Sequence, residues 1–323
     1  MNNKIVVLDG YTLNPGDLSW EPFEKLGAIT VYDRTPADQI RARASGAQYL
    51  LTNKTPLTAE TLMSLPDLRY IGVLATGFNV VDADAARQRS IPVTNIPTYG
   101  TDSVAQHAIA LTLELARGVA AHAKAVAEGQ WSNNDDWCFS VSSIEELAGR
   151  TMGIIGLGRI GLAVARIGDA MGMRLIAHDA IQLTAQQLDG LSVQYKDLDH
   201  VFSESDVLSL HCPLTDQTRH LVNDQRLDLM KSNAFLINTS RGPLVDADAL
   251  ARALHERKIA GAGLDVLDQE PPAASNPLLK APHCIITPHV AWYAKASRQR
   301  LIDTAAANLR AFLDGTAVHV VNP

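Results

Sequence analysis

The stretch from Thr151 to Gly161 constrains the fold more than any other part of the chain. A run of strand character, Thr151 to Ile155, leads into Gly156-Leu157-Gly158-Arg159-Ile160-Gly161, after which the pattern becomes helical. The first glycine permits a tight turn, because a residue without a Cβ atom has few forbidden backbone angles. The second lets a ligand approach the backbone closely, and the third lets the helix pack against the strand. The pattern therefore predicts a strand, a glycine-rich turn and a helix in direct succession.

An acidic residue follows this turn at the spacing that a dinucleotide requires. A second strand-like run, Arg174 to His178, ends directly before Asp179. The helix between the two strands offers unpaired N–H groups and a positive dipole to a pyrophosphate, and the carboxylate can accept hydrogen bonds from ribose hydroxyls. A glycine-rich turn of an ordinary α/β protein is the alternative interpretation, but it leaves the acid and the second strand unexplained. The sequence thus predicts a dinucleotide site that includes Gly156, Gly158, Gly161 and Asp179.

The composition indicates a soluble globular protein. The chain has 323 residues, 46% of them hydrophobic, and a net charge of −7, which suits about two domains of ordinary size. No basic run is present to bind nucleic acid or an anionic membrane, and no apolar stretch approaches the roughly 18 residues of a membrane span. The three cysteines, Cys138, Cys212 and Cys284, are scattered along the sequence. This usage favours a cytoplasmic location and indicates neither a disulfide framework nor a metal site.

The pattern of residues 1–100 alternates between strands and helices. Strands are expected at 5–9, 28–32, 47–52, 68–75 and 91–95, and helices at 17–26, 36–44, 58–65 and 82–89. Strict alternation predicts a parallel sheet with helices on both faces. After the glycine-rich turn a second series begins, with further strands at 207–211, 234–238, 263–267 and 284–287 and a helix at 246–257.

Two long helices bracket the second series, at 101–128 and at 294–313. The economical topology returns the C-terminal helix to the first domain. We therefore expect two doubly wound α/β domains, a Rossmann dinucleotide-binding domain (101–288) inserted into a flavodoxin-like substrate domain (1–100 and 289–323), with the two helices as the hinge. Ser103-x-x-Gln106 reads as a capping box that opens the first of these helices.

The helix at 101–128 is apolar almost all the way round, so it needs cover on more than one side. The following segment carries Trp131, Trp137, Cys138 and Phe139 in an otherwise polar loop. Together these features predict a homodimer in which the segment acts as an interface arm. Burial of the helix between the two domains of one chain is the alternative.

Three residues with side chains suited to catalysis lie near the ends of predicted strands, where doubly wound sheets bind their ligands. Arg241 follows Ile237-Asn238-Thr239-Ser240, Glu270 precedes Pro271-Pro272, and His289 lies in Thr287-Pro288-His289-Val290. Alone, each has an ordinary interpretation: a surface arginine, an acidic loop and a structural histidine. Together they supply a fixed cation, a carboxylate and a titratable imidazole. Histidine suits proton transfer near neutral pH, and the arginine fork matches a carboxylate.

These motifs resemble the D-isomer-specific 2-hydroxyacid dehydrogenase family over essentially the whole sequence. The matching stretches are the glycine motif, Asn238-Thr239-Ser240-Arg241-Gly242, Gly263-Leu264-Asp265-Val266, and the pair of Glu270 and His289. The resemblance implies an NAD-linked, reversible reduction of a 2-oxo acid to the D-2-hydroxy acid. It assigns Arg241 as the clamp on the substrate, His289 as the acid/base and Glu270 as its orienter.

The resemblance also implies further contacts. Ala75-Thr76-Gly77 matches the loop that binds the substrate carboxylate, and Asp265 matches the residue near the nicotinamide carboxamide. Arg159, Ile160, Cys212 and Thr239 are the remaining implied cofactor contacts. Asp179 would repel a 2′-phosphate, and Ala180 and Ile181 supply no compensating cation, so we expect NAD to be preferred over NADP.

Within the family, the sequence is most similar to the glycerate dehydrogenase (hydroxypyruvate reductase) branch, on the stretches Tyr99 to His107 and His289 to Trp292. Hydroxypyruvate is therefore the expected substrate, with glyoxylate weaker and pyruvate poor. Asn53 is a candidate partner for the 3-hydroxyl, although a turn-forming asparagine is an equal interpretation. Trp292 would crowd the pocket and favour short 2-oxo acids, or it packs in the core.

Other activities compete with this expectation. D-lactate or another short D-2-hydroxy acid is the alternative substrate, and an NAD-sensing scaffold or corepressor is the alternative of another class. Formate dehydrogenases typically have glutamine where this sequence has Glu270, which argues against that activity.

Overall fold

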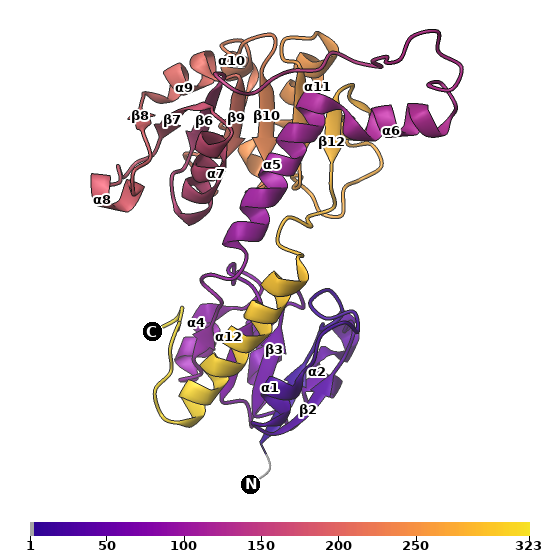
Figure 1. The fold of residues 1–323 in the computed structure, drawn as a ribbon. Helices are drawn as coiled ribbons and strands as arrows, with labels where there is room; N and C mark the ends of the chain where they lie inside the picture. The colour runs from indigo at the N-terminus through magenta and orange to yellow at the C-terminus, as the bar shows by residue number, and fades with distance from the viewer. Residues whose placement is uncertain (1–2) are drawn as a thin grey trace. The chain divides into compact units, whose positions relative to one another are not determined.

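The computed structural model describes residues 3–323 and divides into two compact units (Figure 1). Unit 1 comprises Met1–Gly100 and Tyr293–Pro323, and unit 2 comprises Thr101–Trp292. We expected the second break directly before His289, whereas the units separate after Trp292. The segment after His289 stays with unit 2 because the Asp265 carboxylate accepts hydrogen bonds from the amides of Val290 and Ala291.

Unit 1 contains a five-stranded sheet in the order β2-β1-β3-β4-β5, with every neighbouring pair parallel. This is the flavodoxin-like order. The strands are β1 Lys4–Val7, β2 Ala28–Val31, β3 Tyr49–Thr52, β4 Tyr70–Val73 and β5 Val93–Thr94. The helices are α1 Glu21–Glu24, α2 Ile40–Ala44 after the short 3-10 turn Ala37–Gln39, α3 Ala59–Met63, α4 Ala83–Gln88 and α12 Lys295–Leu313.

The C-terminal helix α12 packs on this sheet although most of the sequence separates the two. The ring of Phe312 lies 6.2 Å from that of Tyr49 and 5.1 Å from that of Tyr70, and both tyrosines are buried strand residues. Near the other end of α12, the guanidinium of Arg298 donates two hydrogen bonds of 2.7 Å to the carboxylate of Asp17. Aromatic burial and a bidentate ion pair thus attach the C-terminal segment to the N-terminal sheet.

Unit 2 contains a seven-stranded parallel sheet in the order β12-β11-β10-β9-β6-β7-β8. Its strands are β6 Thr151–Ile155, β7 Arg174–His178, β8 Val193–Tyr195, β9 Val207–Leu210, β10 Phe235–Asn238, β11 Gly261–Leu264 and β12 Cys284–Ile286. Its helices are α5 Thr101–Arg117, α6 Val119–Ala127, α7 Arg159–Ala170, α8 Ala185–Leu188, α9 Leu198–Glu204, α10 Asp224–Leu227 and α11 Ala247–His255, with 3-10 turns at Gly242–Leu244 and Pro277–Lys280. The direction of strand order reverses between β6 and β9, as in a Rossmann fold, so the predicted fold class is confirmed.

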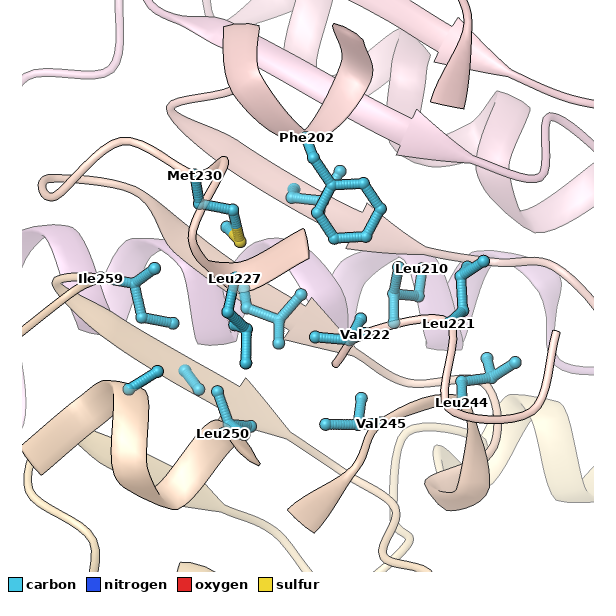
Figure 2. Packing of buried hydrophobic residues seen from close by; sticks show 14 of the residues in the cluster. Phe202, Leu210, Leu221, Val222, Leu227, Met230, Leu244, Val245, Leu250 and Ile259 are labelled. Atoms are coloured by element: carbon cyan, nitrogen blue, oxygen red, sulfur yellow. The ribbon is translucent and has the colours of Figure 1, made fainter. Parts of the chain in front are cut away.

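The core of unit 2 consists of one hydrophobic cluster on each face of its sheet. Successive residues of β9 alternate between them: Val207 packs in the cluster with α5 and α7, and Leu208 in the cluster with α9 and α11. This alternation is expected for a strand that is buried on both faces. Figure 2 shows the second cluster, in which Phe202, Leu227 and Leu250 come from three different helices.

The long helix expected at 101–128 is two helices. Gly118 has a φ of 55°, in the left-handed region, and ends α5 before α6 begins at Val119. Glycine takes this conformation without the penalty that a Cβ atom brings. In the single chain, the α5 side chains of Val104, Ala108 and Leu111 are buried, whereas Val119 and Val126 of α6 are exposed. No helix among residues 3–323 is long and apolar enough to cross a membrane.

Candidate functional site

The three glycines of the turn after β6 serve three different purposes. Gly156 has a φ of 93°, and a Cβ atom there would lie 2.5 Å from the amide nitrogen of Cys212. A Cβ atom on Gly161 would lie 2.1 Å from the carbonyl oxygen of Gly156. Gly158 differs, because a Cβ atom there would meet nothing within 4 Å. The open space above Gly158 adjoins the N-terminus of α7, which begins with Arg159 and Ile160, and this fits a bound pyrophosphate.

Asp179 lies at the end of β7 and fixes the glycine turn. One carboxylate oxygen accepts a hydrogen bond of 2.6 Å from the amide of Leu157, and the other accepts one of 3.0 Å from the amide of Ile181. The carboxylate therefore has a structural role at the strand end, and each oxygen retains a further lone pair for a ribose hydroxyl.

A pocket of about 440 Å³ opens beside Asp179 at this edge of the sheet. Its lining residues come from the ends of β7 and β8 and from α9, and they are His178, Asp179, Gln182, Tyr195, Lys196, Asp197 and His200. Lys196 is a cation that the sequence interpretation missed, because it follows a strand that was not predicted. Its ammonium lies 3.4 Å from the carboxylate of Glu204.

Two buried polar atoms near the ends of β9 and β10 lack a hydrogen-bond partner within the described part of the chain. They are Nδ1 of His211 and Oγ1 of Thr239. Buried polar atoms are rarely left unsatisfied, so Thr239, a predicted cofactor contact, fits a site that a polar ligand completes. Burial lowers the pKa of His211 to about 4 and raises the pKa of the neighbouring Cys212 thiol to about 11. Both side chains are therefore uncharged at neutral pH.

Glu270 and His289 form a hydrogen-bonded pair. His289 Nδ1 lies 2.6 Å from Glu270 Oε2, and the amide of Leu267 donates to the other oxygen of Glu270 at 3.0 Å. Each of the two side chains is 37% exposed. The carboxylate thus fixes the orientation of the ring, while Nε2 is the nitrogen that can exchange a proton with a ligand.

Asp265 holds the segment that carries His289. Its side chain is only 1% exposed, and it accepts hydrogen bonds from the Thr287 hydroxyl (2.6 Å) and from the amides of Val290 (2.9 Å) and Ala291 (2.8 Å). Its carbonyl oxygen also accepts from the amide of His289 at 2.9 Å. Sequence reasoning assigned Asp265 to the cofactor. The contacts above are with residues 287–291, which are called the catalytic loop because of the role proposed below for His289.

Arg241 lies at the end of β10, next in the sheet to the strand that precedes Glu270. Its Nη1 donates to the carbonyl oxygen of Ser240 at 2.7 Å, and the guanidinium is exposed. A Cβ atom on Gly242 would lie 1.9 Å from the carbonyl oxygen of Leu267, so glycine allows the two loops to pack together. The structure therefore brings Arg241, Glu270 and His289 to the carboxyl edge of the three neighbouring strands β10, β11 and β12.

The remaining candidates belong to unit 1, except Trp292, the last residue of unit 2. Asn53 follows β3 and is buried; its side-chain amide donates to the Thr12 hydroxyl at 3.3 Å. Ala75, Thr76 and Gly77 follow the neighbouring strand β4, and the Thr76 hydroxyl donates to the carbonyl oxygen of Ile96 at 2.8 Å. These unit 1 residues all lie at the carboxyl edge of one sheet, as a ligand-binding loop cluster requires.

Asp9 is a residue of this edge that sequence reasoning missed. It follows the buried strand β1, and its carboxylate accepts hydrogen bonds from the amides of Asn53 (2.8 Å) and Thr55 (2.7 Å). Asp9 thereby fixes the backbone of the Asn53 turn. The signal was available in the sequence, because an acid directly after an apolar strand is expected at the carboxyl edge of a parallel sheet. Across residues 3–323 no group of three or more His, Cys, Asp or Glu side chains could hold a metal ion.

Comparisons with known proteins agree with this geometry. Residues 109–291 match the family model described as "D-isomer specific 2-hydroxyacid dehydrogenase, NAD binding domain". The chain is 49% identical to a hydroxypyruvate reductase of Blautia hydrogenotrophica over 99% of both chains, and 39% identical to a glycerate dehydrogenase of Methylorubrum extorquens over 99% of both. Among solved structures, the TT0316 protein from Thermus thermophilus is similar with a TM-score of 0.85 and 34% identity, over 98% of this chain and 99% of that one.

Proposed function

The chain belongs to the D-isomer specific 2-hydroxyacid dehydrogenase family, an NAD-binding family of oxidoreductases, and from this premise we propose that it reduces hydroxypyruvate to D-glycerate. Membership confirms the resemblance seen in the sequence motifs. The observation that carries the proposal is the pair of His289 and Glu270, joined at 2.6 Å beside Arg241 at the edge of a nucleotide-binding sheet. The substrate follows from the relatives named hydroxypyruvate reductase and glycerate dehydrogenase.

The three edge residues have complementary roles in this proposal. When bound, the nicotinamide cofactor supplies the hydride. The carbonyl oxygen of the substrate gains negative charge as the ketone is reduced, and protonated His289 delivers a proton to it through Nε2. Glu270 stabilises the imidazolium and keeps Nδ1 protonated. Arg241 holds the substrate carboxylate with its planar fork of N–H groups, which a lysine lacks. In the direction of oxidation, His289 accepts the proton.

The cofactor residues divide by the part of NAD that each would hold. Gly156, Gly158 and Gly161, with the amides of Arg159 and Ile160 at the start of α7, would hold the pyrophosphate. Asp179 would accept hydrogen bonds from the adenosine ribose. Cys212, Thr239 and Asp265, which follow β9, β10 and β11, would lie along the nicotinamide half. The pocket beside Asp179 also contains Lys196 and His200, and the positive charge of Lys196 would attract a 2′-phosphate. Discrimination against NADP would therefore depend on repulsion by the Asp179 carboxylate.

Substrate size and polarity would be set mainly from unit 1. The backbone of Ala75, Thr76 and Gly77 would bind the carboxylate, and Asn53 would accept or donate a hydrogen bond to the 3-hydroxyl. A site with a buried polar group rejects substrates that leave it unpaired. Asn53 is buried, so pyruvate, which lacks the hydroxyl, should be a poor substrate. Trp292 would limit the length of the substrate.

The experiment is a steady-state assay of NADH and NADPH oxidation at 340 nm with a panel of 2-oxo acids. We expect kcat/KM to be highest with hydroxypyruvate, lower with glyoxylate and poor with pyruvate, and higher with NADH than with NADPH. Higher efficiency with pyruvate would favour D-lactate instead and leave the reaction class standing. Absence of turnover with every 2-oxo acid would favour an NAD-sensing scaffold.

A homodimer is the second part of the proposal. Exposed apolar side chains occur on α6 and on the segment that follows it: Val119, Val126, Trp131 and Trp137, the last of them 86% exposed. Side chains of this size gathered in one stretch of sequence are typical of an interface. Sedimentation equilibrium should give twice the 34.8 kDa of one chain; a mass equal to one chain would contradict the dimer.

The cysteines support a cytoplasmic location. Cys138, Cys212 and Cys284 are all free, and Cys138 is exposed. A free exposed thiol persists in a reducing compartment. Cell fractionation should recover the protein with cytoplasmic markers, and recovery with another fraction would contradict this location.

A further inference from the structure

Two side chains of α5 contact the catalytic loop on either side of His289. The hydroxyl of Ser103 donates to the carbonyl oxygen of Ala291 at 2.5 Å, and His107 Nε2 lies 2.9 Å from Thr287 Oγ1. Ser103 and His107 are one helical turn apart, so they share a face of α5. That helix lies against β10 and β11, the strands that lead to Arg241 and Asp265 (Figure 1).

The hydrogen bonds between His107 and the loop have a defined direction. The Thr287 hydroxyl donates its hydrogen to Asp265 Oδ1 at 2.6 Å, since an ionised carboxylate can only accept. Thr287 Oγ1 must therefore accept from His107, whose ring carries a hydrogen on Nε2. The same carboxylate accepts from the amides of Val290 and Ala291. The result is a relay from His107 through Thr287 and Asp265 to the backbone that directly follows His289.

The catalytic loop needs such support because of its backbone. His289 has a φ of 54°, and the left-handed region is strained for a residue that carries a Cβ atom. Neighbouring contacts must therefore hold it there. Glu270 contacts the ring, but the amides on either side of the strained residue are held by Asp265.

The hydrogen bond from Ser103 to Ala291 lies close to both points at which the chain passes from one unit to the other. Helix α5 begins at Thr101, immediately after the first segment of unit 1, and Ala291 lies just before the chain re-enters unit 1 at Tyr293. The hydrogen bond from Ser103 to Ala291 thus joins the two connections by which unit 2 continues into unit 1.

We propose that His107 is a positioning residue for the reduction, acting through Thr287 and Asp265 to hold His289 in the conformation that pairs with Glu270. The inference rests on the proposed acid/base role of His289. It gives α5 a part in the chemistry, since loss of the donor on His107 would let the Asp265 carboxylate turn and the loop relax.

The test uses the full-length enzyme with NADH and hydroxypyruvate. His107→Leu removes the donor, and His107→Gln places an amide N–H near the position of Nε2. Displacing a catalytic group by about 1 Å can cost about 100-fold in rate, so we expect His107→Leu to lower kcat about 10- to 100-fold. The KM for hydroxypyruvate and the Kd for NADH should change little. His107→Gln should recover most of the rate.

Two further variants, Thr287→Val and His255→Leu, complete the test. Thr287→Val removes the relay with little change of shape, and it should lower kcat even if His107→Leu does not fold. His255→Leu, at an exposed histidine at the end of α11, is the matched control and should behave like the parent. Parental kcat in His107→Leu or in Thr287→Val would overturn the inference. So would equal impairment of His107→Leu and His107→Gln, because that result indicates a packing role.

The proposed function fails in a different way. In that case the parent reduces no 2-oxo acid, or His289→Ala retains turnover. An active parent with an inactive His289→Ala and an unimpaired His107→Leu would contradict the positioning role alone.

Discussion

The glycine turn after β6 and the catalytic loop after β12 both place a residue in the left-handed region at the carboxyl edge of the same sheet, but by different means. In the turn the residue is Gly156, with a φ of 93°, and the absence of a side chain is sufficient. In the loop the residue is His289, with a φ of 54°, and its side chain is the proposed acid/base group. Glycine cannot replace it, so the buried carboxylate of Asp265 holds the backbone instead. One feature is encoded locally, and the other depends on long-range contacts.

The largest expected effect comes from removing the functional side chain of the loop. His289→Ala should lower kcat by about 100- to 10,000-fold, the usual contribution of general acid–base catalysis. The Kd for NADH should change little, because the glycine turn is a separate structure. Arg241→Ala should behave similarly through loss of the substrate clamp. Stopped-flow turnover and fluorescence titration with NADH measure the two quantities, and loss of NADH binding in either variant would contradict the separation of roles.

Substitutions in the glycine turn should instead change NADH binding. In Gly156→Ala the new Cβ atom would lie 2.5 Å from the amide nitrogen of Cys212, and the strained backbone costs about 1–3 kcal/mol. We expect a lower unfolding temperature and weaker NADH binding. Gly158→Ala is the matched control, because its Cβ atom meets no protein atom within 4 Å. It should keep the parental unfolding temperature and still weaken NADH binding, by occupying the space above the turn. Parental NADH affinity in Gly158→Ala would mean that the pyrophosphate binds elsewhere.

Asp265→Asn tests whether the Asp265 carboxylate supports the catalytic loop or binds the cofactor. If the carboxylate holds the catalytic loop, its replacement by an amide places an NH2 group against the amide of either Val290 or Ala291, which donate to different oxygens of Asp265, and kcat should fall about 10- to 100-fold at an unchanged NADH Kd. If the carboxylate instead serves the nicotinamide carboxamide, the Kd should rise. Calorimetric titration with NADH, alongside kcat, separates these results.

The sequence predicts the parts of the site that are encoded locally better than the parts that depend on long-range contacts. The glycine turn was predicted because all its determinants are adjacent in sequence. Arg241, Glu270 and His289 were proposed because each follows a predicted strand, and the structure places them at one edge of the sheet. Ser103 was taken as a helix cap, whereas α5 already begins at Thr101 and the Ser103 hydroxyl contacts Ala291. His107 was not identified at all. Both contact residues more than half the sequence away, and no local pattern records such pairings.

The fold shows the same limits. Strand β8 was missed because it is a short edge strand, Val193–Tyr195, with an exposed glutamine at its centre and no buried residue. Strands buried on both faces, such as β9 and β10, were recognised from their continuous apolar runs. The break at Gly118 was missed because an isolated glycine within an apolar helical pattern is often tolerated.

Glu270→Gln should produce a smaller change in rate. The glutamine can still accept a hydrogen bond from Nδ1 of His289, but it lacks the negative charge that strengthens this hydrogen bond during proton transfer. We expect kcat/KM for hydroxypyruvate to fall about 10-fold, which corresponds to about 1.4 kcal/mol of transition-state stabilisation, at an unchanged Kd for NADH. A kcat/KM equal to that of the parent would contradict the role of Glu270.

The smallest expected effect is on stability and concerns the histidine packed under the glycine turn. A Cβ atom on Gly156 would lie 2.6 Å from the carbonyl carbon of His211, and burial lowers the pKa of that imidazole from 6.5 to about 4. As the pH falls, the unfolded chain takes up the proton first, so His211 reduces the free energy of unfolding progressively between pH 6.5 and 4. The loss is at most about 3.5 kcal/mol, since one pKa unit corresponds to about 1.4 kcal/mol.

The test is His211→Gln. His211 Nε2 lies 2.8 Å from the Ser209 hydroxyl. Glutamine keeps a group that can hydrogen-bond there and does not titrate, so urea unfolding of this variant should depend less on pH over that interval. Equal slopes in the parent and His211→Gln would show that this histidine is not the group whose burial ties the stability of the glycine turn to pH.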